Sequence, residues 1–258
     1  MNRTLILGIF LLCPYLCFTQ IRVHLNAHAH NDYEHPRPLR ESLQNGFNSV
    51  EADVHLYKGE LRVAHNLAND QSPTLQELYL NPLDSLIKAN DGFVYPGAPE
   101  PFYLMIDIKT NGEATYQVLK SVLNNYQKLL CTTSVCPVKI FLSGQKPSST
   151  MVKDGYSGIG NDGRPDDLGK QYPIELMPVI SDNFNNWSSW DGKNAINEED
   201  LQPIKTLAQR VHAEGRKLRL WAIPDNEMAW EVLLEAGVDL INTDHLPELN
   251  AFLTRKGL

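Results

Sequence analysis

The sequence predicts an α/β protein, a single-domain (β/α)8 TIM barrel in which parallel strands alternate with helices. Strand-like apolar segments alternate with helical segments about eight times, as in barrels of this kind. About 239 residues remain once a predicted N-terminal leader is set aside, and this length suits one complete domain. An open doubly wound sheet is the alternative, but no glycine-rich turn follows the first predicted strand.

Seven segments have the apolar character of buried strands, and an eighth is weaker. They cover residues 21–29, 49–55, 102–108, 138–142, 175–180, 217–223 and 238–242, with the weaker candidate at 156–160. A short extra strand is expected at 60–65 and a helix at 74–89. The clearest helix spans 198–214, and another follows Pro224, with Asp225 as its N-cap and Gly237 as its stop.

Residues 1–19 are predicted to be a signal peptide, which leaves residues 20–258 as the mature domain. Arg3 precedes an apolar run from Leu5 to Phe18, and polar residues follow that run. The run is shorter than a transmembrane helix requires, and Pro14 interrupts it. We therefore expect export to the periplasm or the extracellular space, without stable insertion in a membrane.

The mature chain is acidic, because the net charge of −8 becomes −9 when Arg3 leaves with the leader. This charge argues against nucleic acid as a partner and leaves a small-molecule or lipid-derived substrate open. The sequence does not indicate an oligomeric state. Cys131 and Cys136 form either a disulfide or two free thiols.

Histidines mark the end of the first predicted strand and the chain after the short extra strand. Strand periodicity places four polar side chains of residues 23–30 on one face: His24, Asn26, His28 and His30. Because barrel active sites form at the carboxyl ends of the strands, His28 and His30 are candidates for proton transfer, together with His65.

Carboxylates on the next two strands are the candidate metal ligands. Glu51 and Asp53 are two residues apart and point to the same side, which is costly unless a cation compensates their charge. Asp107 adds a third acid, and this all-oxygen set suits one hard divalent cation, Mg²⁺ or Ca²⁺. Lys109, on the same face as Asp107, is a candidate phosphate ligand. His55 is interpreted as a wall residue.

Five ordered segments resemble the motifs of glycerophosphodiester phosphodiesterases and of phosphatidylinositol-phospholipase-C-like barrels. In particular, the chain resembles a branch that includes the fungal altered-inheritance-of-mitochondria proteins. The likeness covers nearly the whole mature chain, and its segments are HAHNDYEHPRPL, GFNSVEADVHLYKGELRVAHN, FYLMIDIKT, KLRLWAIPD and GVDLINTDH.

This resemblance implies a phosphoric diester hydrolase that uses two histidines as general acid and general base around a metal. One histidine is His28 or His30, and the other is His65. His30 is favoured, because the following Asn31-Asp32 could orient it. The metal ligands carried over are Glu51, Asp53 and Asp107. Trp221 and Asp244 are expected to line the substrate pocket and support the barrel mouth.

The chain departs from the family pattern at three places. The usual His-Arg-Gly is replaced by His-Asn-Asp or His-Ala-His, which removes an arginine that contacts phosphate. His65-Asn66 stands in place of His-Asp, and Asp107 in place of Glu. The identity of the diester is therefore left open.

Two other readings compete with diester hydrolysis. A His-x-His on the first strand also resembles amidohydrolases, but no histidine lies between His65 and His212 to complete their metal site. A non-catalytic barrel that binds lipid or sugar through Trp187, Trp190 and Trp221 would have no need for the histidines and the acids.

Overall fold

The computed structural model describes residues 21–98, 100–131 and 135–258, and confirms the predicted TIM barrel. The signal-peptide prediction for residues 1–19 lies outside the described residues. Neighbouring barrel strands pair in parallel, and β1 pairs with both β2 and β9, which closes the barrel. The eight strands are β1 (His24–Ala29), β2 (Phe47–Tyr57), β4 (Phe102–Ile108), β5 (Val138–Gly144), β6 (Ile159–Gly163), β7 (Val179–Asn183), β8 (Lys217–Trp221) and β9 (Leu240–Thr243).

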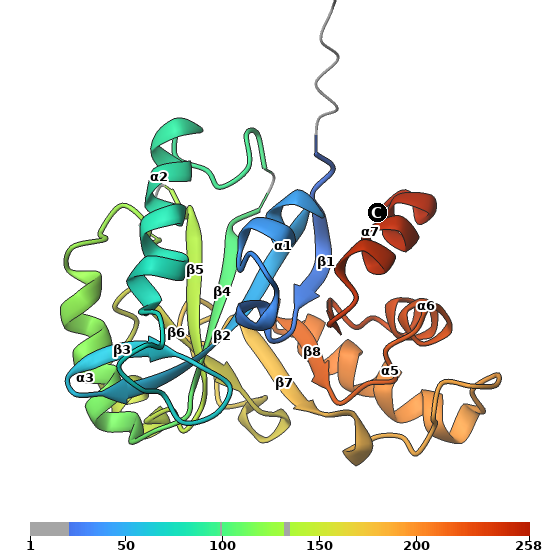
Figure 1. The fold of residues 1–258 in the computed structure, drawn as a ribbon. Coiled ribbons are helices and arrows are strands. Elements are labelled where there is room, and N and C mark those ends of the chain that lie inside the picture. Colours follow the sequence, from blue (N-terminus) through green and yellow to red (C-terminus); the bar gives the residue numbers. More distant parts are fainter. Residues whose placement is uncertain (1–20, 99, 132–134) are drawn as a thin grey trace, which may run out of the picture.

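Helices cover the outside of the barrel (Figure 1). They are α1 (Arg40–Gln44), α2 (Asn81–Ala89), α3 (Gly112–Leu123), α4 (Ser148–Asp154), α5 (Glu198–Ala213), α6 (Glu227–Glu235) and α7 (Leu246–Lys256), with a π-helical turn η2 (Gln76–Leu80) and 3-10 turns η1 (Asp32–Glu34), η3 (Pro165–Asp167) and η4 (Phe184–Asn186). The predicted extra strand is β3 (Glu60–Val63), which pairs antiparallel with the end of β2. The ribbon of β2 and β3 extends beyond the barrel wall (Figure 1).

Strand alternation explains where the core and the site lie. On β4, Leu104, Ile106 and Ile108 belong to the main core between barrel and helices. Tyr103 and Met105 belong to a separate apolar cluster with Phe141, Val179 and Leu240. Asp107 continues the Tyr103 and Met105 face toward the carboxyl end of the strand, because side chains alternate. The polar site is therefore built above an apolar layer.

Several element boundaries differ from the prediction, including the following three. The strand expected at 175–180 begins at Val179, because the chain turns before it, with the Met177 amide bonded to the Pro173 carbonyl. The weak strand expected at 156–160 forms three residues later, at Ile159–Gly163. Asn226 caps α6 in place of Asp225, which instead accepts hydrogen bonds from side chains and a backbone amide.

The prediction that His24 and His28 share a face is wrong. The His24 ring bonds the Leu258 carbonyl and the Asn250 side chain, at the C-terminal end of the chain. The His28 ring faces Ser49 on β2. The register between β1 and β2 shifts between these two histidines, and this irregularity breaks the simple alternation.

The structure joins Cys131 and Cys136 in a disulfide, one of the two alternatives left open by the sequence. Within the described residues, no helix combines the length and the apolar character needed to cross a membrane.

Candidate active site

A polar cavity of about 320 Å³ opens at the carboxyl ends of the barrel strands. A larger groove of about 710 Å³ runs along α1 and α2, but its lining lacks the clustered histidines and acids that could do chemistry. The smaller cavity is therefore the candidate site. It is lined by His30, Asn31, Glu51, Asp53, His65, Met105, Asp107, Lys109, Ser143, Gly144, Arg164, Arg219 and Trp221.

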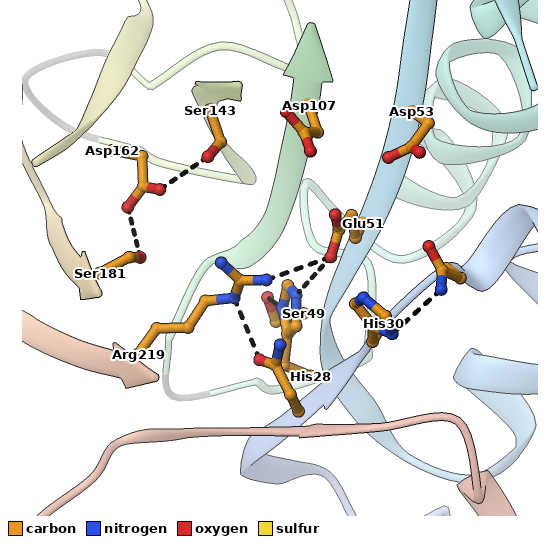
Figure 2. A network of polar contacts seen from close by, with 12 residues as sticks. His28, His30, Ser49, Glu51, Asp53, Asp107, Ser143, Asp162, Ser181 and Arg219 are labelled. Atoms are coloured by element: carbon orange, nitrogen blue, oxygen red, sulfur yellow. Dashed lines mark hydrogen bonds and ion pairs between the residues drawn. The ribbon is translucent and has the colours of Figure 1, made fainter. Parts of the chain in front are cut away.

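The three predicted metal ligands converge in this cavity. One oxygen from each of Glu51, Asp53 and Asp107 lies within 4.8 Å of the others. The strand register explains the meeting, since Asp53 on β2 is directly paired with Asp107 on β4. Figure 2 shows the three carboxylates facing one space at the ends of these strands.

Each acid uses one oxygen in an ion pair and keeps the other free of such contacts. Lys109 Nζ lies 2.6 Å from Asp107 Oδ2 and 3.0 Å from Asp53 Oδ2. Arg219 Nη2 lies 3.2 Å from Glu51 Oε2. Asp53 Oδ1 and Asp107 Oδ1 are buried without a hydrogen-bond partner in the part of the chain that is described.

Burial and neighbouring groups move the pKa values of Asp53 and Glu51 in opposite directions. Burial raises the pKa of Asp53 to about 6, although the nearby Tyr33 hydroxyl and Lys109 ammonium group oppose the shift. Burial also acts to raise the pKa of Glu51. Hydrogen bonding to His28 and the charge of Arg219 outweigh that effect and hold the pKa of Glu51 below its ordinary value.

His30 lies at the cavity and His28 lies beneath it. The His30 Nδ1 atom is 2.9 Å from Asp244 Oδ1 and 3.1 Å from the Asn31 side-chain amide. Burial acts to lower the pKa of His30, but the hydrogen bond to Asp244 and the charges of Glu51 and Asp244 outweigh it, so the pKa is raised. Asp244, directly after β9, supports the mouth through this contact, but it is not among the residues that line the cavity.

His28 is fully buried and is absent from the cavity lining. Its Nδ1 lies 2.7 Å from Ser49 Oγ, and its Nε2 lies 3.6 Å from Glu51 Oε2. Burial, with the charge of Arg219, lowers the pKa of His28 to about 4. This environment suits a neutral imidazole that holds Glu51 in place.

His65 reaches the same cavity from the loop after β3. Its Nδ1 lies 3.0 Å from the Tyr33 hydroxyl and 3.8 Å from Asp53 Oδ2. The Tyr33 hydroxyl also donates to Asn31 Oδ1, at 2.9 Å. Asn31 and Tyr33 therefore form a line of polar contacts between His30 and His65.

Asp32 does not orient His30, contrary to the expectation. Its carboxylate is fully buried and accepts bonds from the Leu39 amide, the Ser42 hydroxyl and the Tyr79 hydroxyl. It holds together the chain that follows β1, while Asn31 makes the contact with His30.

The remaining predicted residues divide between the cavity and other places. Trp221 lines the cavity, whereas the Trp187 indole donates to Asp182 and the Trp190 indole to the Asn194 carbonyl. His55 is buried and bonds the Ala64 carbonyl, in keeping with a wall residue. The His212 ring bonds Asp239, away from the cavity lining.

Sequence reasoning missed Arg164, Arg219 and Tyr33. Arg219 is two residues before Trp221 on β8, so strand alternation alone puts both side chains on one face. Arg164 follows the weakest predicted strand, and no signal in the sequence singles it out. Tyr33 lies between the first histidine motif and the next helix, where its reach to His65 depends on the fold.

Comparisons with known proteins agree with this picture. A family model described as an AIM6-like phosphodiesterase domain matches residues 18–135, and one described as the glycerophosphoryl diester phosphodiesterase family matches residues 217–247. The altered inheritance of mitochondria protein 6 homolog of Arthroderma benhamiae is 27% identical, over 86% of this chain and 82% of that protein. The altered inheritance of mitochondria protein 6 of Saccharomyces cerevisiae is 24% identical, over 85% and 68% respectively.

A crystal structure of a glycerophosphodiester phosphodiesterase from Agrobacterium tumefaciens shares 11% identity with this chain. The match between the two covers 89% of this chain and 99% of the chain in that crystal structure, with a TM-score of 0.49. The family and sequence matches show that the chain is similar to glycerophosphodiester-phosphodiesterase-like proteins. Among these proteins, it resembles the altered inheritance of mitochondria protein 6 proteins.

Proposed function

We propose that this protein is a metal-dependent phosphoric diester hydrolase that uses His30 and His65 as its general acid and general base. The observation that carries the proposal is the convergence of both imidazoles and the three-acid cluster on one cavity at the barrel mouth. The phosphodiesterase-type family matches support the same class of reaction.

The acid cluster fits one divalent cation, Mg²⁺ or Ca²⁺. Asp53 Oδ1 and Asp107 Oδ1 are buried and have no hydrogen-bond partner among the described residues, and the Glu51 carboxylate lies in the same cluster. Buried polar atoms of this kind normally have a partner. Oxygen ligands of this kind suit hard cations. When bound, such a cation supplies charge neutralisation for the phosphoryl oxygens of the substrate.

The residues of the chain then divide the proton transfers. One imidazole removes a proton from the attacking oxygen, from water or a substrate hydroxyl, as that oxygen forms a new bond to phosphorus. The ester bond on the opposite side breaks, and the other imidazole protonates the leaving oxygen. Asp244 orients His30, and Tyr33 orients His65, so that the Nε2 atom of each ring is left to act.

The proposed substrate is a small-molecule or lipid-derived phosphodiester. The net charge of −8 disfavours nucleic acid. We further propose export, with loss of residues 1–19, to the periplasm or the extracellular space. Intact-mass measurement of the protein from its native host tests this, because retention of residues 1–19 contradicts cleavage.

The activity is tested with purified protein on a panel of glycerophosphodiesters, inositol phospholipids, sphingomyelin and an aryl phosphodiester. We expect hydrolysis of at least one diester, loss of the activity in EDTA, and recovery when Mg²⁺ or Ca²⁺ is restored. Unchanged rates in EDTA would reject the role of the metal. Absence of cleavage of every diester, with either cation, would reject the function.

A further inference from the structure

The cavity has a second polar wall, away from the acid cluster. Arg164 follows β6 and Trp221 ends β8, whereas the acids lie on β2 and β4, on another part of the barrel. The Arg164 guanidinium lies over the Trp221 ring, 5.0 Å from its centroid. In Figure 2, Asp162, the neighbour of this wall, lies on the opposite side of the acids from His30.

Arg164 is anchored through one nitrogen only. Nη1 lies 2.9 Å from Asp162 Oδ2 and 2.9 Å from the Gly163 carbonyl. Nε and Nη2 make no hydrogen bond with any described residue, although about a third of the side chain, 34%, is exposed at the cavity. Since a guanidinium donates through all three nitrogens, donors remain for a ligand.

The other cations of the cavity are already committed. Lys109 lies between Asp53 and Asp107, and Arg219 is buried against Glu51 and Asn242. The phosphoryl group is expected at that end, beside the acid cluster. Arg164 is therefore left to meet a different part of the substrate.

The charged groups around Arg164 are the carboxylates of Asp162 and Asp167 and the ammonium group of Lys146. Asp162 is fully buried and accepts hydrogen bonds from Ser143 and Ser181 in addition to its pair with Arg164. Lys146, on the loop after β5, is half-buried and makes no side-chain ion pair with the described part of the chain. Burial lowers the pKa of Lys146, with the charge of Asp162 opposing the shift and that of Arg164 adding to it.

We propose that Arg164, supported by the Trp221 ring and with Lys146 beside it, binds a second anionic group on one ester arm of the substrate. The proposal rests on the proposed diesterase function and narrows its substrate to compact diesters whose arm carries a carboxylate or a phosphate. A cavity of about 320 Å³ with polar walls suits such an arm.

Matched substrates test the subsite. One is a 4-nitrophenyl phosphodiester whose second arm is 3-carboxypropyl, and the other carries the uncharged carboxamide in place of the carboxylate. We expect wild-type kcat/KM to favour the carboxylate by about 10- to 100-fold, the range of a charge-assisted hydrogen bond. In Arg164→Gln the preference falls to about one, and Arg164→Lys restores part of it. Arg210→Gln, which removes an exposed arginine of α5, is the matched control and keeps the wild-type preference.

Two results would overturn the subsite. One is a wild-type enzyme that cleaves both substrates equally well. The other is an Arg164→Gln variant whose kcat/KM falls by the same factor on both substrates. Arg164 then contacts the phosphoryl group that the two substrates share. A carboxylate preference that survives in Arg164→Gln but falls in Lys146→Gln would move the subsite to Lys146 and reject the role of Arg164.

Binding separates this proposal from the proposed function if neither diester is cleaved. Calorimetry in Mg²⁺ would compare 3-phosphonopropionate with its amide. Tighter binding of the carboxylate form, lost in Arg164→Gln, supports the subsite even though hydrolysis fails. Equal affinities of the two compounds for the wild-type protein reject it.

Discussion

At the residue scale, the site pairs each reactive group with a neighbour that fixes it. Asp244 holds His30, Tyr33 holds His65, and His28 with Arg219 holds Glu51. These partners come from distant parts of the chain, so the site exists only in the closed barrel. Such supporting contacts determine how well a catalytic group is oriented.

The two cavity histidines should be separable from cation binding. His30→Ala and His65→Ala should each lower kcat by about 10²- to 10⁴-fold, the usual contribution of a general acid or base. Calorimetry should show that Mg²⁺ or Ca²⁺ still binds to both variants. His212→Ala removes an imidazole outside the cavity and is the control. Near wild-type rates for both cavity variants would reject their roles, whereas a silent His30→Ala alone would return the role to His28.

At the element scale, the chain after β1 depends on one buried carboxylate. Asp32 ties η1 to the Leu39 amide, to α1 through Ser42 and to η2 through Tyr79. Leu39 itself has a positive φ of 60°, a backbone conformation that residues other than glycine rarely adopt. The carboxylate thus fixes the segment that carries Asn31 and Tyr33 to the cavity.

Replacement of Asp32 should show a pH-dependent effect on stability. Burial raises the pKa of Asp32 above its ordinary value. The three hydrogen-bond donors and the nearby His35 oppose this shift but do not cancel it. The folded protein therefore binds this proton more tightly than the unfolded chain. The associated stability is present below the unfolded pKa and is lost as the pH rises through the folded pKa.

We expect Asp32→Asn to destabilise the protein by about 1–3 kcal/mol, because buried donors lose an acceptor. The free energy of unfolding of the wild type, minus that of Asp32→Asn, should fall as the pH rises from about 3 to 7. Urea unfolding of both proteins across this pH range measures the difference in their free energies of unfolding. A difference that grows with pH would show that the donors, and not burial, determine the protonation of Asp32.

Gly144, at the end of β5, lies directly against the Asp107 side chain of the acid cluster. Gly144 has a φ of +65°, and a Cβ there would meet Asp107 Oδ1 at 1.9 Å and the Ile108 carbonyl oxygen at 2.5 Å. Gly144→Ala should therefore displace Asp107 and weaken Mg²⁺ or Ca²⁺ binding by about 10- to 100-fold, as disturbed supporting contacts do.

Gly155→Ala is the control for Gly144→Ala. Gly155 has a similar φ of +72°, but a Cβ there meets nothing within 4 Å. Both variants bear the backbone cost of a side chain at positive φ, and Gly144→Ala alone bears the clash. Calorimetry should show reduced cation affinity only in Gly144→Ala. Equal affinities in the two variants would exclude Asp107 as a ligand.

At the scale of the whole molecule, the sequence predicts the barrel and the acid cluster because both follow from strand periodicity. Glu51, Asp53 and Asp107 alternate with apolar residues on strands that become direct neighbours. Strand periodicity does not predict the contact of Arg164 with Trp221 or that of Tyr33 with His65, because each joins segments that are far apart in the sequence. The shift at β1 that separates His24 from His28 likewise depends on the closed sheet.

Cation binding should also stabilise the entire barrel, since the three ligands come together only in the folded state. A ligand that binds the folded state alone, at 100 times its Kd, adds about 2.7 kcal/mol. For a domain of this size, that corresponds to an increase of about 5–10 °C in Tm. We expect EDTA-treated protein to show this increase in Mg²⁺ or Ca²⁺, and excess EDTA to reverse it.

Asp53→Asn should abolish this increase in Tm, because it removes a carboxylate from the cluster. Asp70→Asn removes an exposed carboxylate that pairs with Lys58, and it should keep the increase. Thermal unfolding followed by circular dichroism measures all three proteins without any substrate. If no divalent cation raises the Tm of the wild type, Lys109 and Arg219 alone balance the charge of the cluster, and the proposed metal site is wrong.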